Sequence, residues 1–180
     1  RDDSAALATR ILSAASSRAD EAEVILSSRR GLATRFGANA VIQNQSVESA
    51  SATLRVINRG KQARVVLDRF DDESIADAAA RAAALAGAQP SAQQFLPLFD
   101  GKVVYKQNDG AWVEATAKAV AAAHVKAFTP TIDASVKDGH EASGLVQTGA
   151  SAVALANSKG IFGYHRTTHS SIAATVRTPD

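Results

Sequence analysis

The sequence predicts an α+β fold, a two-layer sandwich in which helices cover an antiparallel sheet. Apolar residues recur at helical spacing near the N-terminus and again after residue 71, and they alternate at strand spacing over several long stretches. Turns rich in glycine and asparagine separate the alternating stretches. One long alternating pattern occurs twice, which predicts two related halves, each built from a helix and a hairpin.

The chain begins with a predicted helix of about four turns. Three capping side chains precede its apolar stripe: Asp2, Asp3 and Ser4, then Leu7, Ile11, Ala14 and Ala15. The period then changes to two, and a strand is predicted through Ala22, Val24 and Leu26. This strand ends at the polar residues 27–31, and residues 32–36 resume the extended pattern until Gly37–Asn39 break it.

A long strand, a return strand and a helix complete the first half. Val41–Ile57 alternates throughout, Asn58–Lys61 has the composition of a tight hairpin, and Ala63–Leu67 is the return strand. Asp71 and Asp72 cap the second helix, whose stripe of small residues ends at Ala86, with Gly87 as the predicted stop: Ile75, Ala78, Ala79, Ala82, Leu85 and Ala86.

Residues 89–110 are predicted to be a linker between halves 1–88 and 111–180. Periodicity disappears here, and Pro90, Pro97 and Gly101 interrupt the chain. An irregular connection of this length is unusual in a compact domain, so Lys102–Lys106 is expected to pair as a short strand.

The second half repeats the order of the first. A helix is predicted over Trp112–Phe128, and Thr129-Pro130 is expected to end it. A strand through Ile132, Ala134 and Val136 follows, and residues 137–139 form a turn. Residues 153–155, the turn Asn157–Gly160 and the long strand Ile161–Arg177 complete this half.

The repeat itself is visible when Thr53 is placed over Thr175, an offset of 122 residues. Ile42 then falls on Tyr164, and apolar residues at both ends of each copy flank a polar middle. Because the offset is even, Ile42 and Tyr164 are predicted to occupy equivalent places on the same face of their strands. The alternative, that any two alternating strands can be aligned this well by sliding, stays open.

Composition narrows the class of protein. The 180 residues suffice for one ordinary domain, and 46% of them are hydrophobic. With no cysteine, the chain has no disulfide scaffold, thiolate metal site or cysteine nucleophile. The net charge is only +2, and we find no apolar run of membrane-spanning length. These features predict a cytoplasmic protein without a membrane partner. The lack of methionine predicts a piece of a longer product, or missing residues.

Four histidines are candidate metal or catalytic residues, and none is assigned such a role. His140-Glu141 begins like a zinc helix, but Leu145 stands where a second histidine is needed, so residues 140–145 are predicted to be a polar loop. His165 and His169 lie in a predicted strand, where four residues span about 13 Å, so both are expected on the surface. His124 is expected to be a partly exposed helix residue, with no carboxylate or second histidine one turn away to orient it.

Two further patterns have plain structural explanations. Asn157–Gly160 could hold an anion on its backbone N–H groups, but a hairpin turn needs the same residues. Arg35, Phe36 and Arg166, together with Phe162 and Tyr164, could stack single-stranded nucleic acid, although burial also explains the aromatic residues. No catalytic, cofactor-binding or metal-ligating residue is therefore assigned in this chain.

Three stretches resemble the N-terminal domain of the TldD/PmbA family. They are Thr34–Phe36 with Asn39 and Ile42–Asn44, then Ala79–Ala86, and most specifically Ala154–Phe162 with Tyr164–Thr167. Together they extend over most of the chain. The family's proteins are named modulators of DNA gyrase and are regarded as metallopeptidase subunits, and the resemblance implies a two-layer α+β domain.

The resemblance also implies what this chain lacks. In the family a His-Glu-x-x-x-His helix of the C-terminal domain binds the metal, so zinc is expected in a C-terminal metal-binding domain absent from residues 1–180. The implied function is that of an N-terminal substrate-cavity or dimerisation domain, in a homodimer or a paralogous heterodimer that cleaves unfolded peptides. The alternative is a binding module for DNA gyrase or nucleic acid, although the near-neutral charge disfavours nucleic acid.

Overall fold

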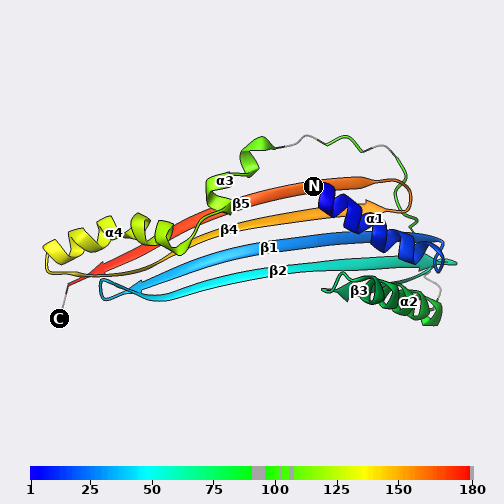
Figure 1. Cartoon of the computed structure of the whole chain (residues 1–180), viewed down its shortest axis with the longest axis horizontal. Coiled ribbons are helices and arrows are strands. Elements are labelled where there is room, and N and C mark those ends of the chain that lie inside the picture. The colour runs from blue at the N-terminus through cyan, green and yellow to red at the C-terminus, as the bar shows by residue number, and fades with distance from the viewer. Residues whose placement is uncertain (91–95, 102, 106–107, 179–180) are drawn as a thin grey trace. The chain divides into compact units, whose positions relative to one another are not determined.

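The computed structural model describes residues 1–90, 96–101, 103–105 and 108–178, and it confirms the α+β fold class. Five strands form one antiparallel sheet in the order β3-β2-β1-β4-β5 (Figure 1). In chain order the elements are α1 (Asp2–Ser16), β1 (Glu21–Gly37), β2 (Ala40–Asn58), β3 (Lys61–Leu67), α2 (Asp72–Ala88), the 3-10 turn η1 (Asp109–Ala111), α3 (Glu114–Ala117), α4 (Ala121–Lys137), β4 (Glu141–Asn157) and β5 (Phe162–Arg177). No helix in the described ranges is long and apolar enough to span a membrane.

The chain divides into two compact units. Unit 1 comprises Arg1–Ser28, Ala50–Gln107 and Ala152–His165, and unit 2 comprises Arg29–Ser49, Asn108–Ser151 and Arg166–Asp180. Strands β1, β2, β4 and β5 contribute residues to both units. Each unit therefore takes segments from both predicted halves of the sequence.

Unit 1 has a core of small and branched aliphatic side chains. Even-numbered residues of β1 and β2 point into it, in agreement with the predicted alternation, and α1 and α2 cover them: Ala22, Val24, Leu26, Ala52, Leu54, Val56, Ala8, Ile11, Ala15, Ile75, Ala78, Ala79, Ala82 and Ala86. The alanine stripe of α2 lets its backbone lie close to the sheet. Asp71 caps this helix as predicted, because its carboxylate accepts a 2.8 Å hydrogen bond from the Ser74 N–H.

The hairpin between β2 and β3 is also confirmed. Asn58 pairs with Lys61, which leaves Arg59 and Gly60 as a two-residue loop. Both loop residues have positive φ, 51° and 74°, as a type I′ turn requires. This geometry matches the twist of the flanking strands and fixes the register from Asn58 to Ala52.

Unit 2 has a smaller core around Phe128 of α4. The Phe128 ring stacks on Phe36 of β1, with centroids 4.2 Å apart and planes 12° apart. Ala142 and Val146 of β4 complete the buried cluster. Gly144 passes directly under the Phe128 ring, since a Cβ there would lie 2.6 Å from two ring carbons. Glycine at 144 therefore lets α4 approach β4.

The predicted helix over Trp112–Phe128 and its end at Thr129-Pro130 are wrong. Trp112 lies outside the helices, α3 is a single turn, and α4 continues through Pro130 to Lys137. Proline removes one helical hydrogen bond and would usually end the helix. Burial of Phe128, with Val125 and Ile132 packed against the same cluster, offsets that loss.

Other boundaries also differ from the predictions. The stretch predicted as a strand, Ile132–Val136, forms the last turns of α4, and the predicted loop at 140–145 is the start of β4. β1 continues through the predicted break at 27–31, and Gly87 lies inside α2. Asp2 and Asp3 lie in the first turn of α1, whose N-cap is Arg1. Val103–Tyr105 form no strand, and Lys102 and Lys106 lie outside the described residues.

The two copies of the repeat occupy corresponding strands. β2 follows β1 along the chain as β5 follows β4, and the first residues of β2 and β5, Ala40 and Phe162, are separated by the predicted offset of 122. The prediction for Ile42 and Tyr164 is wrong, however. Ile42 is 65% exposed and lies beside Gly37, whereas Tyr164 packs against the core of unit 1. Asn44 contacts Thr34 on the covered face, which indicates a local irregularity in β2 between residues 42 and 44.

Candidate functional site

A buried histidine lies at the centre of a polar network in unit 2. His124 of α4 is only 2% exposed. Its Nδ1 lies 3.0 Å from the hydroxyl of Thr34 on β1, and its Nε2 lies 3.0 Å from the hydroxyl of Thr148 on β4. Thr34 also donates a 2.7 Å hydrogen bond to Asn44 Oδ1 on β2. The network thus joins α4 to three strands. The prediction that His124 is partly exposed is wrong.

The hydrogen bonds determine which ring nitrogen carries the proton. A threonine hydroxyl has one proton to donate, and Thr34 donates its proton to Asn44. Thr34 must therefore accept from Nδ1–H of His124. Nε2 is then the unprotonated nitrogen, and it accepts the proton of the Thr148 hydroxyl. Both ring nitrogens of the neutral histidine are satisfied.

Burial lowers the pKa of His124, because the charged ring would lose its hydration without gaining a carboxylate partner. The imidazole is therefore neutral near pH 7. A neutral ring held between two threonines can orient neighbouring elements, but it has no acidic residue to activate it as a base.

A groove of about 440 Å³ opens beside His124. His124 and Thr148 line it, together with residues of α3, of α4, of the segment between these helices and of β5: Ala115, Ala119, Ala123, Ala127, Ser170 and Ile172. This lining offers an uncharged surface with a few hydroxyl groups. It can accommodate an apolar chain, but it supplies neither a nucleophile with a base nor a pair of carboxylates.

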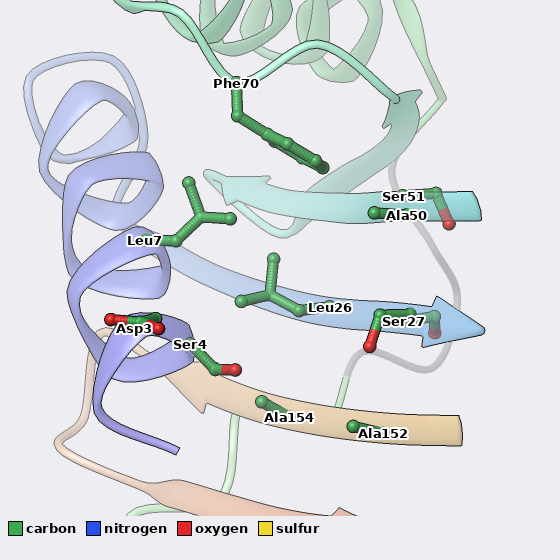
Figure 2. Close-up of a pocket in the computed structure, with 11 residues that line it drawn as sticks. Asp3, Ser4, Leu7, Leu26, Ser27, Ala50, Ser51, Phe70, Ala152 and Ala154 are labelled. Atoms are coloured by element: carbon green, nitrogen blue, oxygen red, sulfur yellow. The ribbon is translucent and has the colours of Figure 1, made fainter. Parts of the chain in front are cut away.

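A smaller pocket of about 140 Å³ lies in unit 1 at the start of α1 (Figure 2). Figure 2 shows Leu7 near the strand that carries Leu26, and Phe70 reaching toward the strand that carries Ala50. Asp3 of α1 also lines the pocket, together with several serines. Its small, mainly apolar lining fits one hydrophobic side chain and carries no catalytic set.

The residues around His140, where the sequence begins like a zinc helix, do not fit a zinc ion. His140 precedes β4, and its neighbour Glu141 begins the strand, where it accepts two hydrogen bonds from Arg177. Within the described ranges, no three His, Cys, Asp or Glu side chains gather as a metal site. A tetrahedral zinc site needs three or four such donors.

The remaining histidines lie where the sequence predicts them. His165 and His169 are exposed residues of β5, four apart on an extended strand. The ring of His169 lies over Gly149 of β4.

The turn Asn157–Gly160 is a hairpin connection, and its own residues use its backbone donors. Asn157 Oδ1 accepts from the N–H groups of Lys159 and Ile161, at 3.0 and 3.1 Å. Lys159 Nζ lies 2.9 Å from Glu21 Oε1. The Glu21 carboxylate also accepts a hydrogen bond from the Leu98 N–H. This hydrogen bond, and then the contact with Lys159, lower the pKa of Glu21. Glu21 in turn raises the pKa of Lys159. The turn therefore offers no free nest for an anion.

The aromatic residues proposed for nucleic-acid stacking are engaged within the fold. Phe36 is buried against Phe128, while Phe162 and Tyr164 pack partly buried on the core of unit 1. Arg166 lies over the ring of Trp112, 4.3 Å from its centroid. This pair could not be predicted from the sequence, since no local spacing connects residues 54 positions apart.

Comparisons with known proteins agree with this architecture. Residues 22–86 match the family model described as PmbA/TldA metallopeptidase domain 1. No curated protein matches the sequence. The chain is similar in structure to TldE from Thermococcus kodakarensis, with a TM-score of 0.75 and 13% identity over 96% of this chain and 43% of that one.

Two further solved structures, both named putative modulators of DNA gyrase, are similar. The protein from Bacteroides thetaiotaomicron gives a TM-score of 0.78 with 12% identity over 98% of this chain and 41% of its own. The protein from Thermotoga maritima gives 0.71 with 12% identity over 97% and 43%. At this level of identity the likeness concerns the fold, and the chain spans about two fifths of the length of each protein.

Proposed function

Because residues 22–86 carry the sequence pattern of the first PmbA/TldD metallopeptidase domain and the whole chain has the fold of TldE and related structures, we propose that the chain is a non-catalytic N-terminal domain of such a peptidase. In this role it forms part of the wall of a peptide cavity and contributes to dimerisation. The reactive metal belongs to another domain.

The observation that carries this proposal is the combination of a family match with a chain that has no fitting metal donors among its described residues. The match covers β1, β2, β3 and most of α2, which are scaffold elements. The similar structures are more than twice as long as this chain, so they have room for a second domain. The groove beside His124 presents hydrogen-bonding and apolar surface, which suits the wall of a cavity better than a reaction centre.

We expect the purified chain to hold no stoichiometric zinc and to cleave no unfolded peptide. The reason is the donor set, because Glu141 is engaged by Arg177 and no second imidazole joins His140. Metal analysis after dialysis against zinc, followed by incubation with an unfolded peptide and mass spectrometry, measures both properties. One tightly held zinc per chain would refute the proposal.

A second function, a module that binds DNA gyrase or nucleic acid, is suggested by the names of two similar structures. The charge of +2 gives little basis for phosphate binding, which requires several clustered cations. We therefore expect only weak DNA binding, measured by fluorescence anisotropy over a salt series. Tight binding that falls steeply with salt would favour the second function over the first.

A further inference from the structure

A groove of about 310 Å³ crosses the strands of unit 2 on the face turned away from its core. The core of this unit buries even-numbered residues such as Thr34, Phe36 and Ala142, whereas most residues that line the groove have odd numbers. Alternate residues of a strand point to opposite faces, so the groove and the buried cluster lie on opposite sides of the strands.

Two glycines shape the surroundings of this groove: Gly31 lines it, and Gly149 lies under the ring of the lining residue His169. An added Cβ at Gly31 would meet no atom within 4 Å, so the space above β1 is open. At Gly149 of β4 the ring of His169 occupies the position of the missing side chain, since a Cβ there would lie 2.7 Å from its Nε2. Glycine at 31 therefore leaves space above β1, and glycine at 149 makes room for the His169 ring.

Four hydrogen-bond donors converge on the groove, one from each strand of unit 2. They are Arg29 of β1, Gln45 of β2, Gln147 of β4 and His169 of β5. Among the described residues, none of these side chains makes an ion pair or hydrogen bond within the chain. No aspartate or glutamate lines the groove. An arginine with three further polar side chains, and no anion beside them, is complementary to a carboxylate.

Arg30, the neighbour of Arg29, does not face this groove. Arg30 points to the opposite face, where it pairs with Glu48 at 3.2 Å and donates to the Ala117 carbonyl. The cationic group of Arg30 is therefore already engaged, whereas that of Arg29 faces the groove without a partner among the described residues.

We propose that this groove binds the carboxylate of an extended peptide, with Arg29 as the charged anchor and Gln45, Gln147 and His169 as additional donors. The identification of the ligand as a peptide rests on the proposed function. The carboxylate can be a C-terminus or an acidic side chain, which present the same chemistry. The groove would thereby favour peptides that carry negative charge.

The test is a titration of the 180-residue chain with three short peptides, followed by amide NMR. The probes are acetyl-trialanine with a free C-terminus, its C-terminal amide, and acetyl-Ala-Glu-Ala amide. At low salt we expect shifts at Gly31 and Gly149 with both carboxylate peptides and none with the neutral amide. If only one carboxylate peptide shifts these residues, that result identifies the source. Equal shifts with the neutral amide, or no shift with any peptide, would overturn the proposal.

Variants separate the groove from the rest of the surface. Arg29→Gln should weaken carboxylate binding by about fivefold or more, because it removes the charged donor. Gly149→Ala should weaken it as well, since the new methyl group displaces the His169 ring. Arg30→Gln, one residue away on the opposite face, should leave binding unchanged. Equal weakening by Arg29→Gln and Arg30→Gln would show a nonspecific charge effect. These binding measurements involve neither zinc nor peptide cleavage, so their outcome is independent of the zinc and cleavage measurements that test the proposed function.

Discussion

Replacing Phe128 with alanine is expected to lower the free energy of unfolding by about 3–5 kcal/mol. The Phe128 side chain is fully buried, and it stacks on Phe36 with ring centroids 4.2 Å apart. Removal of the ring leaves a cavity above Gly144 and exposes the face of Phe36. Such a loss is a large share of the roughly 5–15 kcal/mol that stabilises a domain, so urea unfolding should detect it readily.

Two matched variants separate this effect from a change in helix stability. Val136→Ala, in the same helix at a position 58% exposed, should change the free energy of unfolding by no more than about 0.5 kcal/mol. Phe128→Leu keeps most of the volume and should cost about 1–2 kcal/mol. Similar losses for Phe128→Ala and Val136→Ala would contradict the packing of α4 on β1 and β4.

Phe128 also explains why two local sequence patterns lead to wrong predictions. The pair Thr129-Pro130 is a strong local signal for the end of a helix, and the alternation after it is a strong signal for a strand. Both signals are outweighed by packing, because the helix must continue to bury Ile132 in the same cluster as Phe128. Nothing local indicates that Phe36, some ninety residues earlier, is the partner of this ring.

Elements whose causes are local were predicted well. The cap at Asp71, the two-residue turn at Arg59-Gly60 and the turn at Asn157 each depend on a few adjacent residues. The alternation of β2 toward its C-terminal end predicted the buried Leu54 and Val56 correctly. It failed at Ile42, where the regular alternation of faces is interrupted.

The candidate site around His124 could not be predicted from the sequence either, because its residues are far apart along the chain. Thr34 and Thr148 hold the two nitrogens of His124, and they lie 90 and 24 residues away in sequence. No spacing rule connects a helix residue to two strands at such separations. The open space at Gly31 could not be predicted either, since a glycine within a strand pattern also suggests a break in the strand.

His124 should make the stability of the chain depend on pH. Burial lowers its pKa in the folded chain, whereas the unfolded chain keeps the ordinary value near 6.5. As the pH falls through 6.5, the unfolded chain therefore takes up a proton that the folded chain does not. Unfolding becomes more favourable by this linkage, so the stabilisation is complete above the unfolded pKa and is lost as the pH falls toward the folded pKa.

We expect urea unfolding to show this loss between about pH 7.5 and pH 5.5, a window above the titration of ordinary carboxylates. His124→Gln removes the titrating group, so its free energy of unfolding should change less over the same window. At the upper pH this variant should be less stable than the natural chain by about 1–3 kcal/mol, because glutamine cannot reproduce both hydrogen bonds of the ring.

The exposed His165 of β5 provides the control. His165→Gln removes one imidazole from the surface, so it should retain the pH dependence that His124 imposes and change stability by at most about 0.5 kcal/mol. If His124→Gln and the natural chain lost the same free energy between the two pH values, the imidazole would titrate alike in the folded and unfolded chains. That result would be incompatible with a neutral ring enclosed between Thr34 and Thr148.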